Sequence, residues 1–340
     1  MSLTLLVTID TEGDDEWAFH RRPTLENIPY LREFEAMVER AGAKSTYFVT
    51  QAVATDARSV EVLGEIASRG RSEIGGHCHA WNNPPIDEAR EPEKQYFLNE
   101  LRDDEQHAKL EVLTDALEKS FGARPRTFRA GRFGANAATM RSLAKLGYEV
   151  DSSVTPGITW RRTPGWPGGE GGPDWIDAPL APYRMDERDP RVPGNGPLWQ
   201  VPVTVVRSRR LPDAAEKMLA GFGPTGLVSR VAGKALGNLV WFRPTFHTVE
   251  EMLAAARGAI ARGAPVLNMM LHSSEVMPGG SPYVKTKDEA RAFLGRTEKA
   301  LEIVQSEMKA VPRTLAEYGQ ALNASSAESS AEMVERGTPC

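Results

Sequence analysis

Short apolar runs alternate with amphipathic segments along most of the chain. Residues 3–9 form a mostly apolar run, which is typical of a strand buried on both faces of a parallel sheet. Residues 24–41 place apolar side chains at helical spacing, with Thr24 as a candidate N-cap and Gly42 as a stop. The alternation continues and predicts seven strands: 3–9, 45–49, 72–76, 127–129, 148–151, 198–206 and 265–271.

Helical connections between these strands predict an α/β fold with a parallel sheet, because parallel neighbours need long crossovers. A closed or nearly closed β/α barrel fits best, and a doubly wound open sheet is the alternative. We expect one barrel domain over residues 1–320, with a loop rich in Pro, Gly and Trp at 156–197 and a helical insertion at 207–247. Residues 321–340 are poor in apolar side chains and predict a disordered tail.

Composition narrows the function classes. The 340 residues carry a formal net charge of −5 and no Lys/Arg-rich run, which disfavours nucleic acid and anionic membranes as partners. No stretch has the roughly 18 apolar residues that a membrane span needs, and the first residues lack the basic start of a signal peptide. Only two cysteines occur, Cys78 and Cys340, so we expect a reducing, cytoplasmic location. The sequence does not determine the oligomeric state.

Ionisable residues stand at the ends of the predicted strands, where parallel α/β sheets carry their chemistry. Taken singly, each has a structural explanation: an acidic pair can cap a helix, and a lone histidine can be hydrogen-bonded in the core. Their joint placement favours a hydrolytic metal site of two imidazoles and a carboxylate, with a second carboxylate as base and a further histidine as acid. The residues are Asp10, Glu12, His77, His79, Arg129, Asp151 and His272.

Five stretches follow five of these strands: 8–13, 73–85, 128–134, 151–156 and 271–275. They resemble the motifs of the NodB-type polysaccharide deacetylases, carbohydrate esterase family 4, and most of all a divergent WalW-like branch. The resemblance extends over roughly residues 3–318. It implies a distorted (β/α)7 barrel of the glycoside hydrolase/deacetylase type that binds a divalent metal, with zinc expected.

Roles follow from the resemblance by position. Asp10 stands at the place of the general base, His272 at that of the general acid, and Arg129 at that of the residue that orients the base. Glu12 stands near the place of a metal-binding Asp, and His77 matches the first metal histidine.

The chain departs from the family pattern at two points. Glu12 follows Asp10 by two residues where the family has Asp one residue on, and Trp81 stands four residues after His77. The second imidazole must therefore come from His79 or not at all. Four further residues of these stretches and of the following loop are candidates for substrate binding: Trp81, Arg132, Asp151 and Trp160.

The predicted activity is removal of an N-acyl group, acetyl or formyl, from an amino sugar or a related small amide by attack of metal-bound water. Two alternatives stay open. The same barrel also suits an allantoinase-like hydrolase of cyclic amides, or a non-catalytic sugar-binding barrel. The expected partner is a small-molecule or saccharide substrate, and the acyl group and the sugar are not determined.

Overall fold

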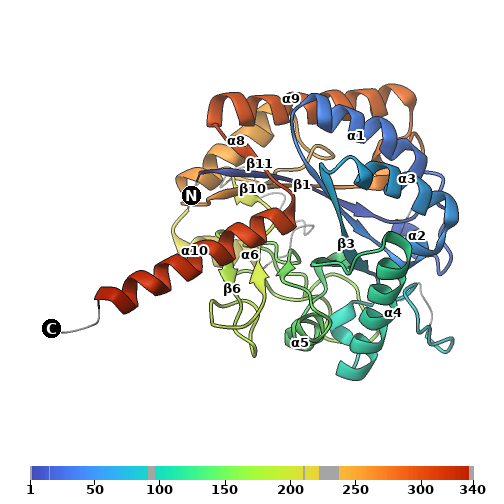
Figure 1. Cartoon of the computed structure of the whole chain (residues 1–340), viewed down its shortest axis with the longest axis horizontal. Helices are drawn as coiled ribbons and strands as arrows, with labels where there is room; N and C mark the ends of the chain where they lie inside the picture. Colours follow the sequence, from blue (N-terminus) through green and yellow to red (C-terminus); the bar gives the residue numbers. More distant parts are fainter. Residues whose placement is uncertain (1, 15, 91–95, 210, 222–236, 337–340) are drawn as a thin grey trace.

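A curled, mostly parallel sheet forms the centre of the molecule, and helices cover its outer side (Figure 1). The computed structural model describes residues 2–14, 16–90, 96–209, 211–221 and 237–336. The sheet order is β10-β1-β2-β3-β4-β5-β7-β6, and β11 pairs with β1. Only the β6–β7 pair of this sheet is antiparallel, and β8 and β9 form a separate antiparallel pair. The predicted α/β class is confirmed as a parallel half-barrel.

The strands are β1 (Thr4–Thr11), β2 (Ser45–Val49), β3 (Ser72–Cys78), β4 (Thr127–Ala130), β5 (Val150–Asp151), β6 (Tyr183–Arg184), β7 (Trp199–Gln200), β8 (Val205–Arg207), β9 (Leu239–Trp241), β10 (Val266–His272) and β11 (Val311–Pro312). The α-helices are α1 (Leu31–Arg40), α2 (Gln51–Thr55), α3 (Ala57–Ser68), α4 (Asp103–Phe121), α5 (Ala137–Lys145), α6 (Asp213–Ala220), α8 (Val249–Ala261), α9 (Lys287–Met308) and α10 (Leu315–Arg336).

The first and last long strands lie side by side. β1 and β10 pair in parallel register from Thr4 opposite Val266 to Asp10 opposite His272. All eight residues of β1 are buried, as expected of a strand that is covered on both faces. This pairing places Asp10 and His272 next to each other at the carboxyl edge of the sheet.

The segment after β7 narrows the open side of the curled sheet. The backbone N–H of Val203 donates to Val154 O at 3.0 Å, and that of Thr204 donates to Asn268 O at 3.2 Å. These bonds connect the β5 side of the sheet to β10. The sequence predicts one strand over 198–206, but the structure divides it into β7 and β8. Pro202 lies between them and has no N–H to donate to a sheet ladder.

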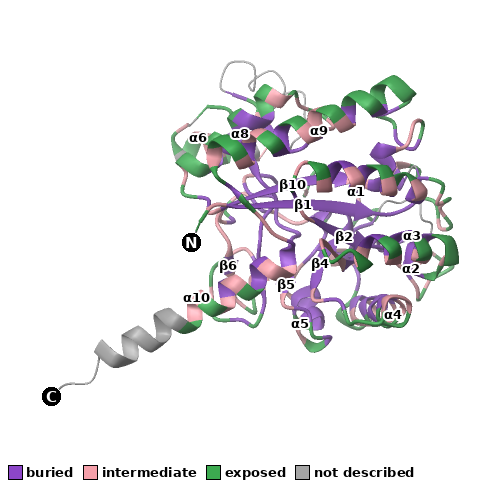
Figure 2. Ribbon diagram, turned by 45° about the horizontal axis from the view of Figure 1, so that its top comes forward, coloured by how far each residue is buried: buried purple, intermediate pink, exposed green. Residues whose placement is uncertain are grey.

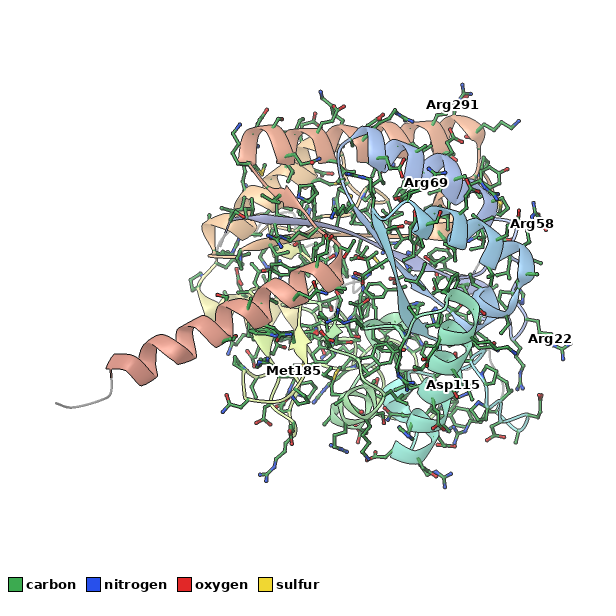
Figure 3. All side chains as sticks on the ribbon, in the orientation of Figure 1. Arg22, Arg58, Arg69, Asp115, Met185 and Arg291 are labelled. Carbon is green, nitrogen blue, oxygen red and sulfur yellow. The ribbon has the colours of Figure 1, made fainter. Side chains whose placement is uncertain are left out.

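The helices bury one face and expose the other. Figure 2 shows the strands buried at the centre and exposed residues along the outer sides of α1, α3 and α9. Charged side chains such as Arg58 on α3 and Arg291 on α9 point away from the sheet (Figure 3). Thr248 and Thr286 cap α8 and α9 through their side-chain oxygens, which satisfies N–H groups that have no partner within the helix. No described helix is long and apolar enough to cross a membrane.

The C-terminal segment differs from the prediction. The sequence predicts a disordered tail from residue 321, but α10 continues to Arg336 and projects from the body in Figure 1. Leu315, Tyr318 and Leu322 join a buried cluster with strand residues such as Leu6. This contact anchors the helix, and the Ala and Glu residues that follow propagate it readily. The disordered-tail prediction is therefore wrong up to residue 336, and 337–340 lie outside the described residues.

The two irregular regions are described to different extents. Of the predicted insertion at 207–247, residues 210 and 222–236 lie outside the described residues, and the rest includes α6 and β9. The loop at 156–197 packs on the turn after β4. Trp160 stacks on Phe133 with ring centroids 5.6 Å apart, and Trp175 Nε1 donates to Phe133 O at 3.3 Å. The loop therefore lies at the carboxyl end of β4.

Candidate active site

The carboxyl ends of β1, β3 and β10 bring acidic and histidine side chains together. His272 Nε2 lies 3.8 Å from Asp10 Oδ2 and 3.8 Å from Glu12 Oε1. His77 Nε2 lies 3.2 Å from Glu12 Oε2 and 4.0 Å from Asp10 Oδ2, and His79 Nε2 lies 2.6 Å from Glu12 Oε2. We call these five residues the carboxylate–histidine cluster.

Arg129 fixes one oxygen of Asp10. Its Nη1 donates to Asp10 Oδ1 at 2.8 Å, while Nε and Nη2 donate to Ser152 O at 3.0 Å and Thr8 Oγ1 at 2.8 Å. Arg129 is fully buried, and breaking a buried ion pair from one side costs about 3–5 kcal/mol. The guanidinium thus pairs with Asp10 and leaves Asp10 Oδ2 on the side of the histidines.

Glu12, His77 and His79 have the arrangement of metal ligands. One ligand atom of each lies within 4.8 Å of the others. His77 Nδ1 lies 2.8 Å from Arg129 O, which only accepts, so Nδ1 carries the proton of the neutral ring and Nε2 has a free lone pair. This buried Nε2 has no hydrogen-bond partner among the described residues. A lone pair that faces a carboxylate leaves room for a cation between them, and an N/O donor set suits zinc.

The ring of His79 is held by packing. Trp81 lies against it with ring centroids 4.3 Å apart, and a Cβ atom at Gly131 would lie 2.3 Å from His79 Nδ1. Nδ1 itself has no hydrogen-bond partner among the described residues. Metal-binding histidines usually donate their second nitrogen to an acceptor. His77 therefore meets the requirements of a ligand more completely than His79.

Two polar residues hold the backbone of Glu12. Asn27 Nδ2 donates to Glu12 O at 2.9 Å, and the Glu12 N–H donates to Ser273 Oγ at 3.0 Å. Asn27 Nδ2 also donates to Ser273 Oγ at 2.9 Å. Glu12 is thus fixed just beyond the end of β1, where its side chain reaches both His77 and His79.

Charges within the cluster shift its pKa values. Burial acts to raise the pKa of Glu12, but the positive charge and hydrogen bonds of the histidines outweigh it and hold that pKa well below its usual range. Burial lowers the pKa of His79 despite Glu12. For His77, burial acts in the same direction, yet Asp10 and Glu12 raise its pKa. An ionised Glu12 and a neutral His79 are the forms that bind metals.

His272 is the most accessible member of the cluster. Its side chain is 16% exposed, against 5% for Asp10 and 2% for Glu12. Trp17 packs edge-on against it with ring centroids 5.2 Å apart, and Tyr283 packs on Trp17 in turn. Among the five cluster residues, His272 is therefore the one most open to solvent.

The structure does not bring all the predicted substrate residues to the cluster. Asp151 is fully buried and accepts hydrogen bonds from the N–H and hydroxyl of Ser153 at 2.9 and 2.6 Å. Its carboxylate thus stabilises the local backbone. Trp160 Nε1 donates to Thr155 Oγ1. Arg132 stacks over the ring of Phe97 and donates to Pro164 O.

Trp81 is the substrate candidate that adjoins the cluster. It is only 2% exposed and lies between His79 and Phe19, whose ring centroid is 4.9 Å away. Trp81 packs against the imidazole ring of His79 and holds that ring in place. It offers little free surface to a ligand.

Sequence reasoning missed Arg243, which donates to His272 Nδ1 at 2.8 Å. It lies in the predicted helical insertion at 207–247, and no motif marks it. Glu275, which accepts from Arg243 Nη2 at 2.6 Å, follows His272 by three residues. The position of Glu275, three residues after His272, is the sequence feature that could have indicated a polar group on the Nδ1 side of His272.

The curled, mostly parallel α/β sheet carries the carboxylate–histidine cluster at the carboxyl ends of its strands. Residues 24–150 match the family model of polysaccharide deacetylases. The predicted resemblance to polysaccharide deacetylases is confirmed over these residues. The WalW-like branch stays a prediction. No curated protein matches the chain in sequence.

Solved structures share the fold. A Mycobacterium smegmatis protein whose name assigns it to the polysaccharide deacetylases is 17% identical, with a TM-score of 0.54 over 96% of this chain and 92% of its own. A Parabacteroides distasonis protein named for glycoside hydrolases and deacetylases is 14% identical, with a TM-score of 0.60 over 94% and 71%. At these identities the likeness establishes the fold alone, and the activity has to be argued from the cluster.

Proposed function

We propose that the chain is a metal-dependent hydrolase that removes an acetyl or formyl group from the nitrogen of an amino sugar or a related small amide. The family match implies a hydrolase of carbon–nitrogen bonds of the deacetylase type. The observation that carries the finer proposal is the meeting of two carboxylates and three histidines at the ends of β1, β3 and β10.

Glu12, His77 and His79 are the proposed metal ligands, and zinc is the proposed ion because of the N/O donor set. When bound, such an ion polarises a carbonyl group and lowers the pKa of water. Asp10 is then the remaining carboxylate. Arg129 occupies its Oδ1, so Oδ2 is the atom that accepts a proton from the attacking water.

Amide hydrolysis needs a group that accepts a proton from water and a hydrogen-bond donor for the departing nitrogen. The water oxygen bonds to the carbonyl carbon, its proton passes to Asp10 Oδ2, and the carbon–nitrogen bond breaks as the nitrogen gains a proton. His272 lies across from Asp10, with Nε2 3.8 Å from Asp10 Oδ2. Its Nε2 is therefore placed to present a hydrogen to the departing nitrogen.

The compartment is part of the proposal. Two cysteines in 340 residues, of which Cys78 is free and buried, fit a reducing cytoplasm. A cytoplasmic enzyme of this kind acts on a soluble or lipid-linked sugar precursor. Fractionation of cells that express the tagged chain tests this part of the proposal.

One experiment tests the activity. The purified chain is loaded with zinc and assayed for acetate and formate release from N-acylated amino sugars and sugar nucleotides, with a cyclic amide alongside. We expect acid release that Asp10→Asn lowers by about 10²–10⁴-fold in kcat per folded molecule, with metal content unchanged. Its stability should fall, because the variant breaks the buried ion pair with Arg129. Ring opening without acid release would favour the cyclic-amide alternative. Inactivity on every compound with full metal content would leave the non-catalytic alternative.

A further inference from the structure

Three aromatic side chains from separate segments gather beside His272. Trp17 follows β1, Phe246 lies between β9 and α8, and Tyr283 precedes α9. Trp17 packs edge-on against His272 with ring centroids 5.2 Å apart. Tyr283 packs on Trp17 at 5.4 Å, and Phe246 packs on Tyr283 at 5.0 Å. We call Trp17, Phe246 and Tyr283 the aromatic platform.

The two outer rings of the platform are open to solvent. Tyr283 is 43% exposed and Phe246 is 47% exposed, and they are two of the eight large apolar side chains that the described residues expose. Single exposed apolar residues are ordinary on a protein surface. The informative feature is that these two rings contact each other and adjoin a candidate active site.

The platform is fixed to His272 at both ends. Trp17 contacts the imidazole ring, and the guanidinium of Arg243, which lies 2.8 Å from His272 Nδ1, stacks over Phe246 at 4.5 Å. Arg243 is held in turn by Glu275, with Nη2 2.6 Å from Oε1. Rings that are already in place lose little conformational freedom when a ligand binds, which favours affinity.

The exposed area of the platform suits a small ligand and not a protein. An aromatic side chain has about 150–250 Å² of surface, and both outer rings expose less than half of theirs. A stable protein interface buries roughly 800 Å² on each partner, which is several times more than these two rings offer. The occupant is therefore the size of one ring.

We propose that the aromatic platform binds a sugar ring joined to the amino sugar that is deacylated. The inference rests on the proposed function, in which His272 faces the departing nitrogen. That nitrogen belongs to the amino sugar, so side chains beside His272 meet the sugar and not the acyl group. A sugar ring presents C–H groups on its face, and these pack against the negative face of an aromatic ring.

The exposed rings, Tyr283 and Phe246, lie beyond Trp17 as seen from His272. They therefore meet the ring next to the reacting one, and the chain discriminates a disaccharide from a monosaccharide or a small amide. None of the three platform residues belongs to the five stretches that carry the family resemblance. The platform is thus a feature of this chain's own loops.

Binding tests the proposal without turnover. Isothermal titration calorimetry of the zinc-loaded chain, in an Asp10→Asn background that keeps turnover low, compares N-acetylglucosamine and N-acetylgalactosamine with disaccharides of each in several linkages. We expect the best disaccharide to bind at least about tenfold more tightly than its monosaccharide. Tyr283→Leu, which keeps an apolar side chain without a ring, should raise the disaccharide Kd about 3–10-fold. Tyr283→Phe should leave it unchanged.

Kinetics supply the second readout if the proposed activity is found. Tyr283→Leu and Phe246→Leu should raise KM for the disaccharide by the same factor with kcat changed less than twofold, because they remove binding that is made equally before and during the reaction. Both constants for the monosaccharide should stay unchanged. Val311→Ala is the control, since Val311 is 40% exposed but lies on β11, which pairs with the start of β1 at the opposite edge of the sheet.

Two results would overturn the proposal. One is equal affinity of the folded chain for the monosaccharides and for every disaccharide. The other is an unchanged disaccharide Kd in the double variant Tyr283→Leu/Phe246→Leu when its circular dichroism matches that of its parent. Failure of the proposed function has a different signature: the disaccharide binds and the ring variants weaken it, while the wild type releases no acetate or formate.

Discussion

At the scale of single residues, the cluster depends on which nitrogen or oxygen each neighbour occupies. Arg129 O accepts a hydrogen bond from His77 Nδ1, and Arg129 Nη1 donates one to Asp10 Oδ1. The atoms left over, His77 Nε2 and Asp10 Oδ2, both face the interior of the cluster. One arginine therefore orients a proposed ligand and the proposed base at the same time.

We expect His77→Ala to lower zinc affinity by at least about tenfold, because it removes the ligand candidate with the best-supported geometry. Elemental analysis after dialysis against a defined zinc concentration measures the occupancy, and the zinc-dependent rise in melting temperature gives a second value. His20→Ala, at an exposed histidine, is the control. Full stoichiometric zinc in His77→Ala would contradict the assignment of His77 as a zinc ligand.

Glu35 is a buried carboxylate away from the cluster and predicts a pH dependence of stability. Burial raises its pKa, and the hydroxyls of Ser45 and Tyr47, which donate to Oε2 at 2.6 and 2.7 Å, offset only part of that effect. The folded state thus binds a proton more tightly than the unfolded state. Stability from this group is full below the unfolded pKa and is lost as pH rises through the folded pKa.

Glu35→Gln should therefore reduce the fall in the free energy of unfolding between pH 4 and pH 8. Its amide oxygen can still accept from both hydroxyls. Urea denaturation at a series of pH values measures the slope, and Glu33→Gln, an exposed position on the same helix, is the control. A slope that stays the same in Glu35→Gln contradicts this explanation.

At the scale of elements, the turn after β4 shapes the proposed metal site. Gly131 allows this turn to approach His79 and Cys78 closely, since an added Cβ would lie 2.3 Å from His79 Nδ1 and 2.9 Å from Cys78 O. The second of these atoms is backbone, so the clash cannot be relieved by a side-chain rotation. The position of the His79 ring is thus set by an element from a neighbouring strand.

Gly131→Ala should lower the free energy of unfolding by about 1–3 kcal/mol through overpacking and should weaken zinc binding as His79 is displaced. Chemical denaturation and zinc titration measure the two effects. Gly295→Ala on α9 is a suitable control, because nothing lies within 4 Å of its added Cβ and alanine favours a helix. Equal zinc affinity in Gly131→Ala and the wild type would show that this contact does not position His79.

At the scale of the whole molecule, a buried polar network ties distant strands together inside the curled sheet. Asn268 on β10 lies 2.9 Å from Thr8 Oγ1 on β1 and donates to Ser152 Oγ, just after β5, at 3.0 Å. Arg129 on β4 donates to both hydroxyls. The network links β10, β1 and β4 to the residue that follows β5, and it ends at the Asp10 carboxylate.

Asn268→Ala should cost about 1–3 kcal/mol for each buried group left without a partner and should also lower kcat, because Arg129 loses support for its contact with Asp10. Denaturation and steady-state kinetics measure the two effects. The exposed Asn238→Ala serves as control. A loss of stability without any change in turnover per folded molecule would show that the network supports the fold alone.

The sequence determined the fold class, because burial on both faces produces apolar runs and helical crossovers produce helical periodicity. It also determined which residues stand at strand ends, since strand ends are local features. The pairing of β1 with β10 follows from closing a sheet of seven predicted strands, and it brought Asp10 and His272 together as predicted.

Only the tertiary structure decided which of those residues share a site. Asp151 ends a strand as predicted, yet it is fully buried and its carboxylate accepts hydrogen bonds from Ser153. Arg243 carries no local signal, but the packing of its segment against β10 directs it to His272. Periodicity records burial along one element, whereas a hydrogen bond between segments depends on how the elements pack together.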